Sequence, residues 1–269
     1  MASADTQADG QADGRHVLVT GATSGIGLAV TELLAERGAA VFICARDADN
    51  VDLTVKRLRA RGLEVDGRPC DVRSTEQVRE LVRAAVERYG TVGALVNNAG
   101  RSGGGATAQI PDELWLDVID TNLNSVFRVT REVLEGGGML AAGHGRIINI
   151  ASTGGKQGVA LGAPYSASKH GVVGFTKALG LELAKSGITV NAVCPGYVET
   201  PMAQRVRRGY ADFWEITEDE VLDRFQQKIP LGRYSTPEEV AGLVGYLMSE
   251  TAGPITAQAI NVCGGLGNY

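Results

Sequence analysis

Short apolar runs alternate with longer amphipathic stretches along this chain from Arg15 onward, and this alternation limits the folds available to it. Seven runs lack the regular polar alternation of a half-exposed strand, which predicts strands buried on both faces of a parallel sheet. They span residues 16–20, 40–45, 64–70, 94–98, 145–152, 189–195 and 258–264. Helical patterns lie between them, near residues 25–37, 50–61, 74–89, 112–135, 164–185 and 236–249. The alternation predicts a single α/β domain, a doubly wound parallel sheet of about seven strands with helices on both faces.

Two stretches depart from this rhythm. Residues 1–14 are short, polar and aperiodic, so we expect a disordered leader followed by one domain over residues 15–269. The stretch near residues 200–230 interrupts the last strand and helix units, is rich in aromatic residues and has room for two short helices. Because it follows the carboxyl end of a strand, it predicts a lid over a pocket.

Composition excludes several classes of function. A net charge of −5 and a pI near 5.3 argue against broad nucleic-acid binding. No apolar run reaches the roughly 20 residues that cross a bilayer, and no secretory signal is evident, so we expect a cytoplasmic protein. The four cysteines, which stand at positions 44, 70, 194 and 263, show no paired spacing, which argues against disulfides and against a metal site.

A glycine-rich turn joins the first expected strand to the first expected helix. Gly21, Gly25 and Gly27 follow a G-x-x-x-G-x-G spacing, a variant of the Rossmann dinucleotide fingerprint. Glycines let the backbone approach a pyrophosphate, and the free N–H groups of a helix N-terminus bind phosphate oxygens. A glycine turn without a ligand is the alternative interpretation.

The end of the second strand indicates which nucleotide is preferred. An acidic residue there would bind a free ribose diol, whereas Arg46 suits a 2′-phosphate. Asp47 argues against this interpretation, because it is acidic and lies close to the expected spacing from the glycines. The apolar run ends at Ala45, however, which places Asp47 in the following loop. The pattern favours NADPH over NADH, with Arg46 as an ordinary surface arginine the alternative.

Tyr165 and Lys169 lie four residues apart in a helical pattern, so their side chains share one face. A nearby ammonium favours the phenolate and lowers a tyrosine pKa from about 10, which would give a proton donor usable near neutral pH. The alternative is a core tyrosine beside a surface lysine that extends its ammonium into solvent.

Six elements in chain order resemble the classical short-chain dehydrogenase/reductase family. They are the glycine turn, NNAG at residues 97–100, Asn122, Ser152, the pair Tyr165 and Lys169, and Pro195–Gly196. The resemblance extends from residue 15 to the end. More narrowly, STGGKQG at residues 152–158, the stretch at residues 164–184 and NVCGGLGNY at residues 261–269 resemble ketoreductases of aromatic (type II) polyketide pathways.

This resemblance implies roles for individual residues. Tyr165 would be the general acid, Lys169 the cation that lowers its pKa and binds the nicotinamide ribose, Ser152 the hydroxyl that holds the substrate carbonyl. Asn122 would anchor a water that links Lys169 to solvent. The implied cofactor-binding residues are Gly21, Thr23, Ser24, Gly25, Ile26, Gly27, Arg46, Asp71, Val72, Asn98, Ala99, Gly100, Tyr165, Lys169, Pro195, Gly196, Val198 and Thr200.

The resemblance also implies a substrate and partners. The substrate would be a poly-β-ketone tethered to an acidic acyl carrier protein. Arg73 and Arg101 lie just past strands that end near the cofactor, so we hypothesise that they form a positive rim facing that carrier; two ordinary loop arginines are the alternative. The chain would form a homotetramer through the helices near residues 112–135 and 164–185. Ser102 stands where relatives often have proline before paired glycines, so no stereochemical preference is transferred.

Three other functions remain as alternatives, and a fourth, a sugar epimerase or dehydratase, is not favoured. A catabolic alcohol or steroid dehydrogenase would be expected to carry an acid at the end of the second strand. A 3-oxoacyl reductase of another pathway would share the same catalytic residues. A non-catalytic nucleotide-binding scaffold usually lacks one of the four catalytic residues, all of which are present here. A sugar epimerase or dehydratase would need additional C-terminal sequence for its substrate.

Overall fold

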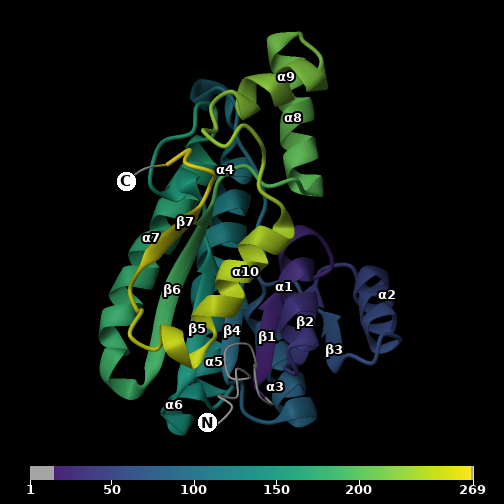
Figure 1. The fold of residues 1–269 in the computed structure, drawn as a ribbon, viewed down its shortest axis with the longest axis vertical. Helices are drawn as coiled ribbons and strands as arrows, with labels where there is room; N and C mark the ends of the chain where they lie inside the picture. Colours follow the sequence, from purple (N-terminus) through teal and green to yellow (C-terminus); the bar gives the residue numbers. More distant parts are fainter. Residues whose placement is uncertain (1–14, 268) are drawn as a thin grey trace, which may run out of the picture.

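The computed structural model describes residues 15–267 and residue 269, so the leader expected at residues 1–14 lies outside the described part of the chain. Seven parallel strands form one sheet in the order β3-β2-β1-β4-β5-β6-β7 (Figure 1). The strands are β1 (His16–Thr20), β2 (Ala40–Ala45), β3 (Val65–Pro69), β4 (Ala94–Asn97), β5 (Gly145–Ile150), β6 (Ile188–Pro195) and β7 (Ala259–Val262). The predicted fold class is confirmed, and each expected strand is present within two residues of its predicted bounds.

Helices cover both faces of this sheet. One core packs α1 (Gly25–Glu36), α2 (Ala48–Arg59) and α10 (Pro237–Leu247) against it. The opposite core packs α3 (Thr75–Tyr89), α5 (Ser125–Glu135) and α7 (Ala163–Glu182). Figure 1 shows α1 and α10 in front of the strands and α3 behind them. Neighbouring residues of one strand, such as Val17 and Leu18, belong to opposite cores, which explains why the strand sequences are apolar throughout.

The helix expected over residues 112–135 is divided into three parts. It comprises α4 (Asp112–Ile119), a π-helical turn over Asp120–Asn124, and α5. A π-turn inserts an extra residue into the helical repeat and changes the direction in which nearby side chains point. Here the turn contains Asn122, whose side chain is fully buried.

A hydrogen-bonded series of polar side chains crosses the buried sheet. Asn97 on β4 donates to Asn149 on β5 over 2.9 Å, and Asn149 donates in turn to Thr176 on α7 over 2.9 Å. Asn97 also donates to Thr130 on α5 over 3.0 Å. All four residues are buried, so this series ties two central strands to the two helices that cover them.

The order of the strands places a crevice between β1 and β4. The chain moves from β1 outward to β2 and β3, then returns to β4 on the other side of β1. Connections at the carboxyl ends of these two strands therefore diverge, which creates the ligand site typical of open α/β sheets.

The aromatic stretch forms two helices beside this crevice. They are α8 (Pro201–Trp214) and α9 (Glu218–Gln226), which lie together at the top of Figure 1. Their shared core contains stacked or edge-packed rings from Tyr197, Tyr210, Trp214, Phe225 and Tyr234. The sequence predicted two short helices here, and α8 is longer than expected. A four-residue helix, α6 (Met139–Ala142), was not predicted.

Candidate active site

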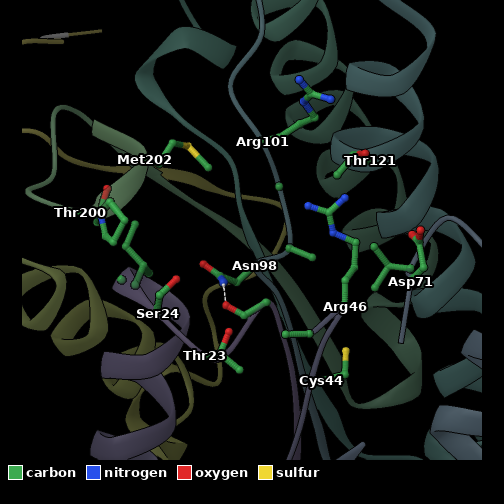
Figure 2. A pocket seen from close by; sticks show the side chains of 18 of the residues that line it. Thr23, Ser24, Cys44, Arg46, Asp71, Asn98, Arg101, Thr121, Thr200 and Met202 are labelled. Carbon is green, nitrogen blue, oxygen red and sulfur yellow. Dashed lines mark hydrogen bonds between the residues drawn. The ribbon is translucent and has the colours of Figure 1, made fainter. Parts of the chain in front are cut away.

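A pocket lies at the carboxyl ends of β1, β2 and β4, where the topology predicts a ligand (Figure 2). Twelve of the expected cofactor-binding residues line it: Gly21, Thr23, Ser24, Gly25, Ile26, Arg46, Asp71, Val72, Asn98, Ala99, Gly100 and Thr200. Nine further residues line it as well: Cys44, Ala45, Cys70, Arg73, Arg101, Thr121, Pro201, Met202 and Arg205. The first turn of α8 therefore forms one wall of the pocket.

The glycine turn has the geometry of a phosphate cradle. Gly21 and Gly25 have φ values of +64° and +53°, a region that side chains other than glycine rarely adopt. A Cβ on Gly27 would overlap the Gly21 carbonyl oxygen and the Asn98 side chain. Asn98 Nδ2 holds the turn through the main-chain oxygens of Thr20 and Gly21, at 3.0 and 2.8 Å.

The N-terminus of α1 opens onto this cradle. Ser24, the residue that precedes the helix, makes no side-chain capping hydrogen bond among the described residues. The first N–H groups of a helix have no partner within the helix, and they favour a bound anion. The residues present therefore fit a dinucleotide pyrophosphate.

Arg46 and Asp47 lie as the strand boundary predicts. β2 ends at Ala45, and Asp47 caps α2 by accepting a hydrogen bond from the Asn50 N–H over 2.8 Å. Asp47 is thus occupied at a helix end, whereas the exposed Arg46 lines the pocket beside Asp71 in Figure 2. Of these two residues, Arg46 and not Asp47 lines the pocket.

A network of charged side chains borders the same pocket. Arg73 makes a bidentate contact with Asp71, at 3.0 and 2.5 Å, and contacts Asp117 on α4 over 2.6 Å. Arg101 also forms an ion pair with Asp117. The Arg73 guanidinium holds the pKa of Asp71 below its usual value. Sequence reasoning missed Asp117, because a polar residue on an amphipathic helix carries no signal of what it contacts.

Tyr165 and Lys169 share one face of α7, as the spacing predicts. The Lys169 Nζ lies 5.9 Å from the centroid of the Tyr165 ring. This ammonium is buried and donates a hydrogen bond over 2.7 Å to the carbonyl oxygen of Ile150, the last residue of β5. The lysine therefore anchors α7 to the strand end instead of extending into solvent.

The electrostatics of this pair differ from the expectation. Burial raises the pKa of Tyr165, and the Ser152 hydroxyl only partly opposes that shift. Burial also lowers the pKa of Lys169 to about 8. The expected lowering of the Tyr165 pKa by Lys169 is therefore not found: burial is the main cause of the shift, Lys169 is not among its causes, and the ammonium donates to a main-chain oxygen.

Ser152 lies beside Tyr165. It follows β5 and precedes a 3₁₀ turn over Thr153–Gly155, and its Oγ accepts a hydrogen bond from the Gly154 N–H over 3.0 Å. A Cβ on Gly154 would stand 3.3 Å from Tyr165 Cε1 and 3.4 Å from Ser152 Oγ. The two hydroxyl-bearing side chains are therefore neighbours across a glycine.

Asn122 completes the group. Its Oδ1 accepts from the Arg101 N–H over 2.8 Å, and its Nδ2 donates to the Arg101 oxygen over 3.0 Å and to Ser168 Oγ over 3.1 Å. A Cβ on Gly100 would stand 3.3 Å from Asn122 Oδ1 and 3.7 Å from Lys169 Nζ. The π-turn thus brings Asn122 close to the lysine.

Three expected cofactor residues support the pocket without lining it. Pro195 ends β6 and pairs with Val262. Gly196 donates its N–H to Val262 over 2.9 Å, and Val198 forms a bridge to Ser235. These residues direct the chain to Thr200, which caps α8 and does line the pocket. Gly27 and Lys169 also lie next to lining residues, and Tyr165 stands one helical turn before Lys169 on α7.

Residues 15–267 and 269 contain no group of three or more potential metal-binding side chains. No helix in this part of the chain combines the length and apolar character needed to cross a membrane. All four cysteines are free and buried.

Comparisons with known proteins agree with this geometry. The family model described as short chain dehydrogenase matches residues 15–211. A Streptomyces virginiae protein described as a ketoacyl reductase of the monensin polyketide synthase is 69% identical over 259 residues, 96% of this chain and 99% of that protein. A granaticin counterpart from Streptomyces violaceoruber is 67% identical, covering 94% and 93%. The crystal structure of a point variant of actinorhodin polyketide ketoreductase with NADPH has a TM-score of 0.93 at 63% identity, covering 97% and 100%.

The buried ammonium of Lys169 predicts a pH-dependent stability. Its folded pKa of about 8 lies below the ordinary 10.5, so between these values the folded protein binds fewer protons than the unfolded chain. The stability contributed by this group therefore rises with pH, by about 2 kcal/mol between about pH 7.5 and about pH 9.5. Urea unfolding of the cofactor-free protein should show this rise relative to Lys169→Met. Equal pH dependence in both proteins would contradict the assignment.

Proposed function

The chain belongs to the short-chain dehydrogenase family, and we propose that it is an NADPH-dependent ketoreductase of aromatic polyketide biosynthesis. Its substrate is a ketone within a poly-β-ketone chain tethered to an acyl carrier protein. The observation that carries this proposal is the convergence of Ser152, Tyr165, Lys169 and Asn122 at the carboxyl end of β5, next to the nucleotide pocket. Identities of 63–69% with the polyketide reductases, over nearly the full length of each, support the substrate class.

The pocket residues have the chemistry that NADPH requires. The glycine turn and the α1 N-terminus would hold its pyrophosphate, Arg46 its 2′-phosphate, and the β3 end near Asp71 its adenine. When bound, NADPH supplies the hydride that reduces the ketone carbon.

The catalytic side chains stabilise the negative charge that develops on the ketone oxygen and supply its proton. As negative charge grows on the carbonyl oxygen, the Ser152 and Tyr165 hydroxyls donate hydrogen bonds to it, and Tyr165 then transfers its proton. The raised pKa of Tyr165 keeps the proton in place until it is needed. Lys169, with a pKa of about 8, is mainly cationic at neutral pH and offsets the charge of the phenolate that remains. Asn122 holds the loop at Arg101 against this site.

Removing the Tyr165 hydroxyl tests the proposed chemistry. With NADPH and a fused bicyclic ketone such as trans-1-decalone, Tyr165→Phe should lose at least about a thousandfold in kcat, because the proton donor is gone. NADPH affinity, measured by fluorescence titration, should stay within about twofold. Retained turnover would refute the assigned acid. A wild-type preference for steroid or simple linear ketones would favour the other reductases of this family.

Nucleotide preference tests Arg46. Arg46→Ser removes a charged hydrogen-bond donor to the 2′-phosphate, so the KM for NADPH should rise about tenfold or more. The KM for NADH, which lacks that phosphate, should hardly change. A wild-type preference for NADH, or an equal effect on both nucleotides, would contradict this role.

We also propose that Arg73 and Arg101 form the positive rim that receives the carrier protein. Both guanidinium groups border the pocket and are about one-third exposed or more, at 36% and 41%. Both contact Asp117, and Arg73 also contacts Asp71, so an acidic partner must compete with these carboxylates. Ion pairs that solvent reaches are weak, so an acidic partner can replace them at a small cost in free energy.

A double substitution tests this rim. Arg73→Ala with Arg101→Ala should raise the KM for carrier-bound substrate about tenfold, while the KM for the free bicyclic ketone changes little. Arg79→Ala with Arg83→Ala is the matched control, because these arginines are exposed on α3 and do not line the pocket. Equal losses with free and carrier-bound ketones would argue against docking.

We propose a cytoplasmic homotetramer as the working assembly. Trp115 and Leu116 on α4, Phe127 on α5 and Leu181 on α7 are large apolar side chains exposed by 41–74%. Apolar exposure over these helices is typical of subunit contacts. A monomeric mass by light scattering would contradict the proposal.

A further inference from the structure

Lys156 lies immediately after the 3₁₀ turn that follows Ser152, and its charge has no role in the chemistry described above. The Nζ donates hydrogen bonds to three oxygens: Ala259 O over 3.1 Å, Asn261 Oδ1 over 3.0 Å and the main-chain oxygen of Tyr269 over 3.2 Å. An ammonium has three donors, and all three are matched here. Lys156 therefore joins the turn to β7 and to the last residue of the chain.

Tyr269 contacts both the Lys156 ammonium and the turn that precedes it. Its ring lies 5.1 Å from the Lys156 Nζ, within the range of a cation–π interaction. Its hydroxyl donates to the Thr153 oxygen over 3.3 Å, inside the same turn. Asn261 also donates to the Gly267 oxygen over 2.9 Å, which fixes the approach of this terminal segment.

The turn that these groups hold carries the Ser152 hydroxyl. The Gly154 N–H donates to Ser152 Oγ, and the Lys156 N–H donates to the Thr153 oxygen over 3.0 Å. On its far side the turn packs against α7, where a Cβ on Gly155 would stand 2.5 Å from the Lys169 oxygen. The turn is therefore held between α7 and the contact of Lys156 with β7. Because only three residues separate Lys156 from Ser152, a displacement of Lys156 would also displace the Ser152 side chain.

We propose that Lys156 is a positioning residue that directs the Ser152 hydroxyl toward the substrate carbonyl, acting through Tyr269 and the Thr153–Gly155 turn. This inference rests on the proposed function, since it concerns the same ketone reduction. A guanidinium holds its donors in a rigid plane, whereas the rotatable ammonium of Lys156 directs its three donors to these three oxygens.

A double-mutant cycle tests the inference. Lys156→Met keeps most of the side-chain length and removes the ammonium, and kcat for the bicyclic ketone should fall about tenfold to a hundredfold. In a Ser152→Ala background the same substitution should have almost no further effect, because both changes remove one function. NADPH affinity should stay within about twofold. An additive loss in the Ser152→Ala background would overturn the proposal.

Titration of the Tyr165 phenol gives a second readout that general destabilisation would not move. Because the Ser152 hydroxyl lowers the pKa of Tyr165, its displacement should raise that pKa in Lys156→Met, measured as the alkaline absorbance difference from the matching Tyr165→Phe protein. An unchanged Tyr165 pKa would overturn the proposal. Lys185→Met, on an exposed lysine after α7, is the matched control and should behave as wild type.

Tyr269→Phe provides a second test in case Lys156→Met loses activity only because it folds poorly. It removes a single hydroxyl and keeps the ring, so the melting temperature should hardly change, while kcat should fall by a smaller factor with the same dependence on Ser152. If the wild-type enzyme does not reduce the bicyclic ketone, the proposed function itself fails. If it does and the cycle is additive, only the role of Lys156 fails.

Discussion

The hydrogen bond from the Lys169 ammonium to the Ile150 carbonyl determines how the catalytic face is assembled. It connects α7, which carries Tyr165, to the end of β5, which leads directly to Ser152. Without it the two hydroxyl groups would belong to elements held together mainly by apolar packing. The same helix and strand are joined deeper in the core by the Asn149–Thr176 hydrogen bond, so two polar contacts fix one interface. Burying the ammonium has a free-energy cost, and the lowered pKa of Lys169 reflects it.

Much of the fold could be predicted because its signals are local. Buried strands are apolar throughout, and glycines at positive φ mark the turn before α1. The position of Arg46 relative to Asp47 followed from where one apolar run ends. Tyr165 and Lys169 followed from helical spacing, and the roles of Ser152 and Asn122 required resemblance to a family, because single polar residues at element ends carry no distinguishing pattern.

Other features depend on contacts between distant segments, which spacing does not reveal. The sequence around Asn122 has the pattern of a continuous helix, although the structure has a π-turn there. The burial of the Asn122 amide is explained only by the loop at Arg101, with which it exchanges hydrogen bonds. Asp117 is separated by 44 residues from Arg73, which it contacts. The Tyr165 pKa was predicted in the wrong direction because burial cannot be judged from helical spacing alone. Lys156 and Tyr269 are 113 residues apart.

The four buried cysteines bear on how the enzyme can be studied. A hydrogen bond with Cys70 and burial raise the pKa of the Cys44 thiol, and burial raises the pKa of the Cys194 thiol. Thiolates, not thiols, react with alkylating reagents. A maleimide dye should therefore leave the native cysteines unmodified while the protein stays folded. One cysteine introduced at the exposed position of Phe213 on α8 would then carry a single fluorophore, and its emission would report directly on the α8–α9 pair during substrate entry.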